Sequence, residues 1–242
     1  MTSGVPSARG WKRVVIKLSG EALMGEGRHG LDAPTLERIA RDLAAAAQSC
    51  EIAVVVGGGN FFRGIQGADK GIERARADSI GMLATVMNGL ALEQAIEMQG
   101  RPARALSSVP MPSLCESYSR RAALHHLNKG RVTICAGGTG NPFFTTDTAA
   151  ALRAAELSAD AVLKATQVDG VYTADPKRDP SAKRYDVLTH DEAIAKNLAV
   201  MDTAAFALAR ENRIPIVVFS IQPEGAITAT LRGVGRATRV IP

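Results

Sequence analysis

The sequence predicts an α/β protein, a three-layer αβα sandwich with a mainly parallel central sheet. Short apolar runs rich in β-branched residues alternate with longer helical patterns along the chain, which is typical of parallel strands joined by helices on both faces. Two of these runs are followed directly by glycine-rich segments. Because parallel strands end at one edge of a sheet, we expect these segments to meet where α/β proteins bind ligands.

Hydrophobic patterns and turn residues place the individual elements. Strands are predicted at residues 13–18, 52–56, 104–106, 132–136, 161–164 and 216–219, the last of which is expected to close the core. Helices are predicted at 34–48, 80–98, 119–127 and 148–156, and two more begin at 189 and 201. The 80–98 pattern predicts a buried helix, with Met82, Met87 and Met98 filling gaps in the core.

Composition limits the class of protein. The 242 residues are 46% hydrophobic and 22% charged, as in globular proteins, and no apolar run is long enough to span a membrane. The first ten residues lack an apolar signal region, so we expect a flexible tail at 1–11, a single domain at 12–242 and a cytoplasmic location. The three cysteines form no CxxC pair, which favours reduced thiols over a zinc site. The net charge of +5 is scattered among few aromatic residues, which indicates a basic surface rather than a nucleic-acid site.

The strand at 52–56 ends in Gly57, Gly58 and Gly59, and Arg63 follows four residues later. Glycines let backbone N–H groups approach an anion closely, and Arg63 would add a permanent charge. The alternative interpretation is a glycine-rich turn beside a solvated arginine. The segment therefore predicts an anion site without excluding a plain turn.

Lys17 and Lys164 each stand near the end of an otherwise apolar strand. An amine in this place suits a phosphate, whereas the alternative is a lysine on an edge strand. Residues 25–30 match GxGxxG, but they follow no strand directly and open no helix. We therefore expect neither a dinucleotide fingerprint nor, without GxxxxGK[ST], a P-loop.

The loop at 137–147 is rich in glycine and in polar side chains. Thr145 or Thr146 is expected to cap the following helix, whose N-terminus favours a phosphate. Asp147 either complements the helix dipole or orients nearby lysines. Asp78 likewise either begins a helix or accepts hydrogen bonds from ligand hydroxyls.

Five segments together resemble the bacterial UMP kinases of the amino acid kinase superfamily. They are KLSG at 17–20, GGGNFFRG at 57–64, GMLATVMN at 81–88, TGNPFFTTD at 139–147 and the stretch at 164–176 that contains VDGVYTADP. The first two segments are shared across the superfamily, whereas the last two are more specific to UMP kinases. The resemblance covers roughly residues 12–240, with departures at Cys135 and Gly137 and a tyrosine at 172 where phenylalanine is also common.

The resemblance implies phosphoryl transfer from ATP to UMP, with Mg²⁺ carried mainly on the ATP phosphates. Its catalytic residues would be Lys17, Arg63, Asp147 and Lys164. ATP would bind mainly through the C-terminal part and UMP through the N-terminal part. The implied ATP-binding residues are Lys17, Leu18, Ser19, Gly20, Gly59, Arg63, Thr166, Tyr172 and Asp175, and the implied UMP-binding residues are Gly58, Asp78, Thr139, Gly140, Asn141, Pro142, Phe143, Phe144, Thr145 and Thr146.

The resemblance also implies a homohexamer that UTP inhibits and GTP activates. The segment corresponding to the GTP response would be Gly25, Glu26, Gly27, Arg28, His29 and Gly30. One rival function is a superfamily kinase acting on an amino acid carboxylate or carbamate. The other is a non-catalytic protein, either a nucleotide or oxyanion binder or a nucleic-acid-contacting regulator that uses the basic surface. The TGNPFFTTD loop disfavours the first, and Lys17, Lys164 and Asp147 disfavour the second.

Overall fold

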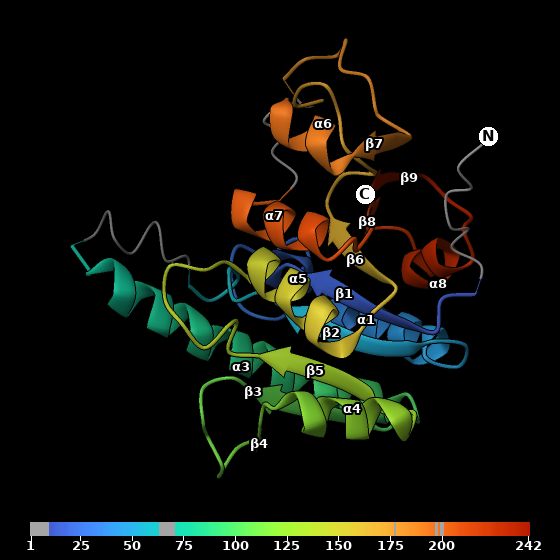
Figure 1. The fold of residues 1–242 in the computed structure, drawn as a ribbon. Helices are drawn as coiled ribbons and strands as arrows, with labels where there is room; N and C mark the ends of the chain where they lie inside the picture. The colour runs from blue at the N-terminus through green and yellow to red at the C-terminus, as the bar shows by residue number, and fades with distance from the viewer. Residues whose placement is uncertain (1–9, 63–70, 177, 197, 199–200) are drawn as a thin grey trace.

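The computed structural model describes residues 10–62, 71–176, 178–196, 198 and 201–242. In these ranges nine strands form one sheet, in the order β4-β3-β5-β2-β1-β6-β8-β9-β7 (Figure 1). The strands are β1 (Arg13–Leu18), β2 (Glu51–Val56), β3 (Ala103–Ser107), β4 (Glu116–Ser117), β5 (Val132–Ala136), β6 (Ala161–Thr166), β7 (Val187–Thr189), β8 (Ile216–Ser220) and β9 (Ala237–Ile241). All neighbouring pairs are parallel except β8 and β9, which are antiparallel.

Helices cover both faces of this sheet. They are the 3-10 helix η1 (Gly20–Leu23) and the α-helices α1 (Ala33–Ala46), α3 (Arg74–Met98), α4 (Arg120–Asn128), α5 (Thr146–Leu157), α6 (His190–Ala195), α7 (Thr203–Glu211) and α8 (Ala226–Leu231). One apolar core lies between the sheet and α1, α3 and α8. A second lies between the opposite face and α4 to α7 (Figure 1). The predicted fold class, a three-layer sandwich around a mainly parallel sheet, is confirmed.

Alternation along β1 decides which way Lys17 faces. Ile16 and Leu18 belong to the core beneath α1, and Val15 belongs to the core beneath α5. Since successive side chains of a strand point to opposite faces, Lys17 shares the α5 side with Val15. A lysine near the end of β1 therefore faces the start of a helix instead of solvent.

Helix α3 corrects two predictions. It begins at Arg74, so Asp78 lies within the helix and not before it. The core role predicted for the methionines is wrong for Met87 and Met98, which are 51% and 75% exposed. Small residues face the sheet instead: a Cβ on Gly89 would lie 3.2 Å from the Cβ of Ala136. Because small and large apolar residues surround the helix, periodicity alone could not identify its buried face.

The C-terminal segment also differs from the prediction. Strand β8 is buried in the core as predicted, but it is not the last strand, because α8 follows it and β9 then returns antiparallel beside it. Only alternate residues of β9 are buried, and Arg239 interrupts its apolar character. This weak signal explains why sequence patterns missed the strand. No helix within the described ranges has the length and apolar character needed to cross a membrane.

The histidine that opens α6 predicts a pH-dependent stability. His190 is 1% exposed and packs edge-on against Phe206 of α7. Neither ring nitrogen has a hydrogen-bond partner in the described part of the chain. Burial lowers the pKa of His190 below its ordinary value of 6.5, while the charge of Asp191 opposes this effect and that of Arg210 adds to it. The native protein therefore resists protonation at this ring.

Stability is expected to fall as the pH drops below about 6.5, because the unfolded chain binds a proton there that the native chain does not. The slope from one such group is at most about 1.4 kcal/mol per pH unit. The free energy of unfolding, measured with urea at pH 7.5, 6.5 and 5.5, should fall less with decreasing pH for His190→Leu than for the parent. The matched control is His29→Gln, at an exposed histidine. Equal pH slopes for His190→Leu and the parent would contradict this prediction.

Candidate active site

Two lysines and one aspartate form a compact cluster at the carboxyl ends of β1 and β6. Lys17 and Lys164 are register partners in these neighbouring parallel strands. Asp147, in the first turn of α5, lies between their ammonium groups: its Oδ1 is 3.0 Å from Lys17 Nζ and its Oδ2 is 2.6 Å from Lys164 Nζ. The three side chains are only 10%, 14% and 13% exposed, in the order Lys17, Asp147, Lys164. The predicted orienting role of Asp147 agrees with this geometry.

Burial and charge act in opposite directions on the aspartate of this cluster. Burial tends to raise the pKa of Asp147, but Lys17 and Lys164 hold it below its ordinary value, so the carboxyl is ionised at neutral pH. Burial also lowers the pKa of Lys164, an effect that Asp147 opposes. Counted by themselves, the two ammonium groups and the carboxylate of this cluster carry one net positive charge, and the charge of Asp202 also acts on Lys164. Such a preorganised charge can stabilise negative charge that develops during a reaction.

The N-terminus of α5 is fixed from two directions. Thr145 caps the helix, and its hydroxyl oxygen accepts hydrogen bonds from the N–H groups of Asp147 and Thr148 at 3.0 and 3.3 Å. Asp202, the N-cap of α7, accepts hydrogen bonds from the hydroxyls of Thr145 and Thr148. Thr145 is therefore the residue that caps the helix, of the two predicted. Asp202 connects α7 to the turn that carries Asp147, a contact that no sequence motif indicated.

The glycine loops after β1 and β2 pack directly on each other. A Cβ on Gly20 would lie 2.6 Å from the backbone nitrogen of Gly59, and one on Gly58 would lie 2.8 Å from the Cβ of Ala84. Only glycine allows backbones to approach so closely. The loop after β2 is also held by a buried amide pair: Asn88 donates to Asn60 Oδ1 at 2.7 Å and to the Gly57 carbonyl at 2.7 Å.

Removing the Asn88 amide is expected to destabilise this loop. Asn88→Ala should lower the free energy of unfolding by about 1–3 kcal/mol, because it leaves buried polar partners in Asn60 and Gly57 unsatisfied. Urea denaturation measures this change. Asn128→Ala, at an exposed position in α4, is the control and should change stability by less than about 0.5 kcal/mol. A loss no larger for Asn88→Ala than for this control would show that the amide pair is dispensable.

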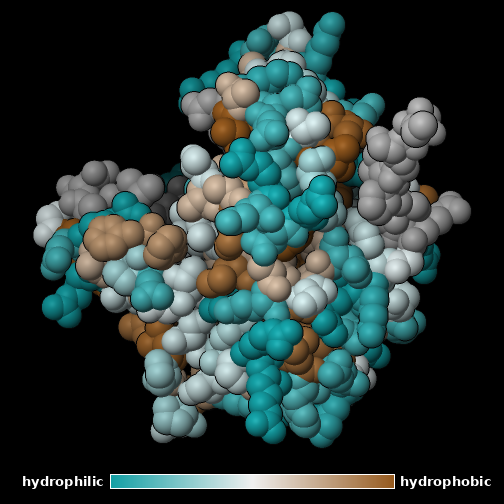
Figure 2. Space-filling model, in the orientation of Figure 1, coloured by the Kyte–Doolittle hydropathy of each residue, from teal (hydrophilic) through white to brown (hydrophobic). Residues whose placement is uncertain are grey.

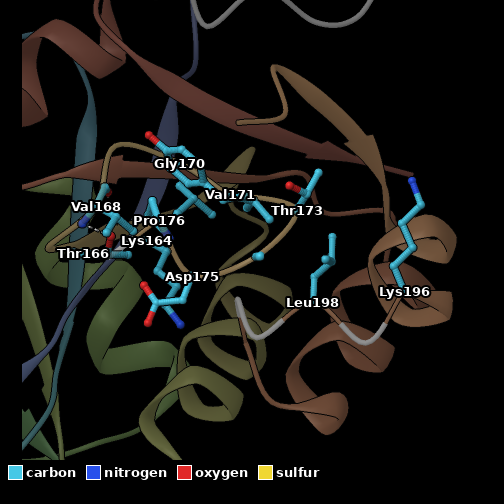
Figure 3. Close-up of a pocket in the computed structure, with 13 residues that line it drawn as sticks. Lys164, Thr166, Val168, Gly170, Val171, Thr173, Asp175, Pro176, Lys196 and Leu198 are labelled. Carbon is cyan, nitrogen blue, oxygen red and sulfur yellow. Dashed lines mark hydrogen bonds between the residues drawn. The ribbon is translucent and has the colours of Figure 1, made fainter. Parts of the chain in front are cut away.

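A cavity of about 580 Å³ lies on the β6 side of the lysine cluster. Figure 3 shows Lys164, Thr166 and Asp175 around it, with Lys196 and Leu198 at its opposite wall. Tyr172 also lines it, so the predicted Thr166, Tyr172, Asp175 and Lys164 are brought together. Sequence reasoning missed Lys196 and Leu198, since no motif marks the segment after α6.

A smaller cavity, of about 170 Å³, lies between the start of α3 and the loop before α5. Seven of the residues predicted for UMP line it: Gly58, Asp78, Thr139, Asn141, Phe144, Thr145 and Thr146. Asp78 accepts a hydrogen bond from the N–H of Phe143 at 2.8 Å and pairs with Arg74 at 2.9 Å. Met82 and Thr85 also line this cavity. They lie within GMLATVMN, which could have pointed to them.

The remaining predicted residues occupy other places. Leu18 is buried in the core, Ser19 caps η1, Gly140 packs against Ser108, Pro142 is half-buried and Phe143 is 65% exposed. The segment at 25–30 lies in the loop between η1 and α1, where Gly30 donates to the Asn60 carbonyl at 2.9 Å. Arg63 lies outside the described residues. Within those residues no three His, Cys, Asp or Glu side chains gather as a metal site.

The edge of the sheet thus holds a cationic cluster, glycine-rich loops and a helix N-terminus between two cavities, an arrangement that defines a phosphate-handling α/β protein. The family model described as Amino acid kinase family matches residues 12–220. The chain belongs to the amino acid kinase family.

Within this family the similarity is to uridylate kinases. The uridylate kinase of Azorhizobium caulinodans is 61% identical over 233 residues, which are 96% of this chain and 98% of that protein. The solved structure of UMP kinase from Ureaplasma parvum has a TM-score of 0.92 at 36% identity and matches 96% of this chain and 99% of its own. That of UMP kinase from Bacillus anthracis has a TM-score of 0.91 at 39% identity, with 96% and 97% covered.

Proposed function

We propose that this chain transfers the γ-phosphoryl group of ATP to UMP, giving ADP and UDP, in pyrimidine nucleotide biosynthesis. The Lys17, Asp147 and Lys164 cluster between two cavities carries the proposal. Two phosphorylated substrates that approach from opposite sides would meet at this positive charge. The similarity to uridylate kinases over nearly the whole chain selects UMP as the acceptor.

The larger cavity is assigned to ATP and the smaller one to the UMP side. Thr166, Tyr172 and Asp175 would contact ATP, as the sequence predicts. Asp78 would exchange its bonds to Arg74 and Phe143 for hydroxyl groups of the acceptor. Arg63 is retained in this proposal as a catalytic residue from the sequence prediction alone.

The chemistry needs positioning and charge more than proton transfer. The acceptor is a phosphate monoester with a second pKa of about 6, so it is largely dianionic at neutral pH and needs no general base. Lys17 and Lys164 would stabilise the charge on the transferred phosphoryl group. Asp147 holds both ammonium groups in place and keeps their repulsion low.

Magnesium is proposed to arrive with ATP. Mg²⁺ prefers oxygen ligands and often binds through substrate phosphates, where it neutralises their charge. Asp147, the carboxylate of the cluster, is already bound by two lysines. Because this carboxylate is already engaged, the residues of the cluster fit a metal that is held mainly by phosphate oxygens and water.

Assembly and regulation follow from the resemblance as further proposals: a homohexamer that UTP inhibits and GTP activates through residues 25–30. Leu83 and Met87 on α3 are about half exposed, at 48% and 51%, and Figure 2 shows hydrophobic surface where α3 and the loop before α5 lie in Figure 1. Exposed apolar surface of this kind favours association. Light scattering would measure the assembly.

The three free thiols support the proposed cytoplasmic location.

A coupled ADP-release assay tests the proposed function. UMP, CMP, acetylglutamate and carbamate would be compared as acceptors with MgATP, and UMP is expected to give the highest kcat/KM. A higher value with acetylglutamate or carbamate would favour the rival kinase. No ADP with any of the four would favour the non-catalytic binder.

A further inference from the structure

A buried arginine lies beneath the glycine loop of the smaller cavity. Arg153, in α5, is 3% exposed, and its guanidinium carbon lies 3.8 Å from the centroid of the Tyr118 ring. Arg153 is not part of the cluster formed by Lys17, Asp147 and Lys164. A charge so far from water needs partners in the protein, and these partners show what the side chain holds.

The guanidinium joins α5 to two loop segments, one at Ser108 and the other at Gly138. Its Nη1 donates to Glu156 Oε2 at 2.7 Å, and its Nη2 donates to Ser108 Oγ at 2.7 Å and to the Gly138 carbonyl at 3.1 Å. The hydroxyl of Ser108 donates to the same carbonyl at 3.1 Å. The carbonyl of Gly138 is therefore held by two side-chain donors, the buried Arg153 and the half-buried Ser108.

This anchoring sets the direction of the next N–H group. The described chain contains no cis peptide bond, and in a planar trans peptide the C=O and N–H point in opposite directions. With the Gly138 carbonyl directed at Arg153, the N–H of Thr139 points the other way. Gly138 and Thr139 both line the smaller cavity, so this peptide group forms part of the wall of the space assigned to the acceptor.

The loop needs such an anchor because of its glycines. Gly137 and Gly138 have φ angles of +75° and +56°, values that glycine adopts readily but does not hold firmly. A Cβ on Gly137 would lie 3.0 Å from the backbone nitrogen of Ser108. Ser108 and Arg153 thus fix a segment whose own sequence favours many conformations.

We propose that Arg153 is a positioning residue for the acceptor: it holds the Gly138–Thr139 peptide so that the Thr139 N–H donates a hydrogen bond to an oxygen of the acceptor nucleotide. The inference rests on the proposed function and extends it. Arg153 touches no reacting atom. It acts through one peptide group, so its loss should weaken acceptor binding selectively.

Steady-state kinetics of Arg153→Met and Ser108→Ala, with UMP and MgATP varied in turn, test this role. We expect the KM for UMP to rise at least about tenfold in Arg153→Met and about threefold in Ser108→Ala. The KM for ATP should stay within about twofold in both. Arg121→Met, at an exposed arginine in α4, is the control and should leave both constants unchanged. Thermal unfolding of each variant reports whether the fold survives.

A folded Arg153→Met with an unchanged KM for UMP would overturn the proposal, as would equal rises in both KM values, which indicate a purely structural role. If Arg153→Met does not fold, Ser108→Ala decides, and an unchanged KM for UMP overturns the proposal. A parent protein that turns over another acceptor but not UMP would refute the proposed function alone. The same variants measured with that acceptor would still decide the role of Arg153.

Discussion

Replacing Lys164 with alanine is expected to lower the turnover of UMP with MgATP at least about a hundredfold, or about 2.7 kcal/mol of transition-state stabilisation. Lys164 lines the larger cavity and pairs with Asp147 at 2.6 Å, so its charge is fixed beside the place proposed for the transferred group. A charge that acts mainly in the transition state affects turnover more than binding. The Kd for UMP, measured by calorimetry, should therefore change by a smaller factor than kcat.

Two further variants make this result specific. Lys164→Arg keeps the charge but spreads it over a planar fork, so it should restore little of the lost turnover. Lys129→Ala, at an exposed lysine after α4, should behave as the parent protein. Turnover within about fivefold of the parent for Lys164→Ala would remove this lysine from the mechanism.

The lysine cluster could be predicted because its members follow from strand geometry. Lys17 and Lys164 stand near the ends of apolar runs, and β1 and β6 are neighbours in register. The aspartate lies in the first turn of the helix after β5, next to a threonine cap. Parallel strands bring such positions to one edge whatever the length of chain between them. The main strands of the fold were predictable because each is a short apolar run, mostly rich in β-branched residues.

Other parts of the site depend on tertiary packing that leaves no local signal. Arg153 and Ser108 are 45 residues apart in sequence, and neither stands in a recognisable motif. Asp202 could be predicted as a helix cap, but its bond to Thr148 at 2.9 Å depends on how α7 packs beside α5. The exposed face of α3 was mispredicted because Leu83 and Met87 are apolar yet point outward. Local patterns identify elements, whereas the partners of a side chain depend on the whole fold.

Asp147→Asn is expected to damage both stability and catalysis. The substitution leaves two buried ammonium groups without the carboxylate that lies 3.0 and 2.6 Å from them. Removing one partner of a buried ion pair typically costs about 3–5 kcal/mol, which chemical denaturation would measure. Turnover should fall at least about a hundredfold, since Lys17 and Lys164 would repel each other out of position. A variant as stable and active as the parent would contradict the proposed role of Asp147.

The pH dependence of this variant separates lost charge from lost shape. Asp147 opposes the lowering of the Lys164 pKa by burial, so without its carboxylate the pKa of Lys164 should fall further. Turnover should decline as the pH rises, because the Lys164 ammonium group loses its proton. In Asp147→Asn this decline should occur at a lower pH than in the parent. In the parent the pKa of Asp147 is below its ordinary value, so the stabilisation it provides is present above about pH 3.9 and is lost only as the pH falls below that value. Asp147→Asn should lack this acid-side loss of stability, and parallel acid-unfolding curves for variant and parent would show that the carboxylate does not act through its charge.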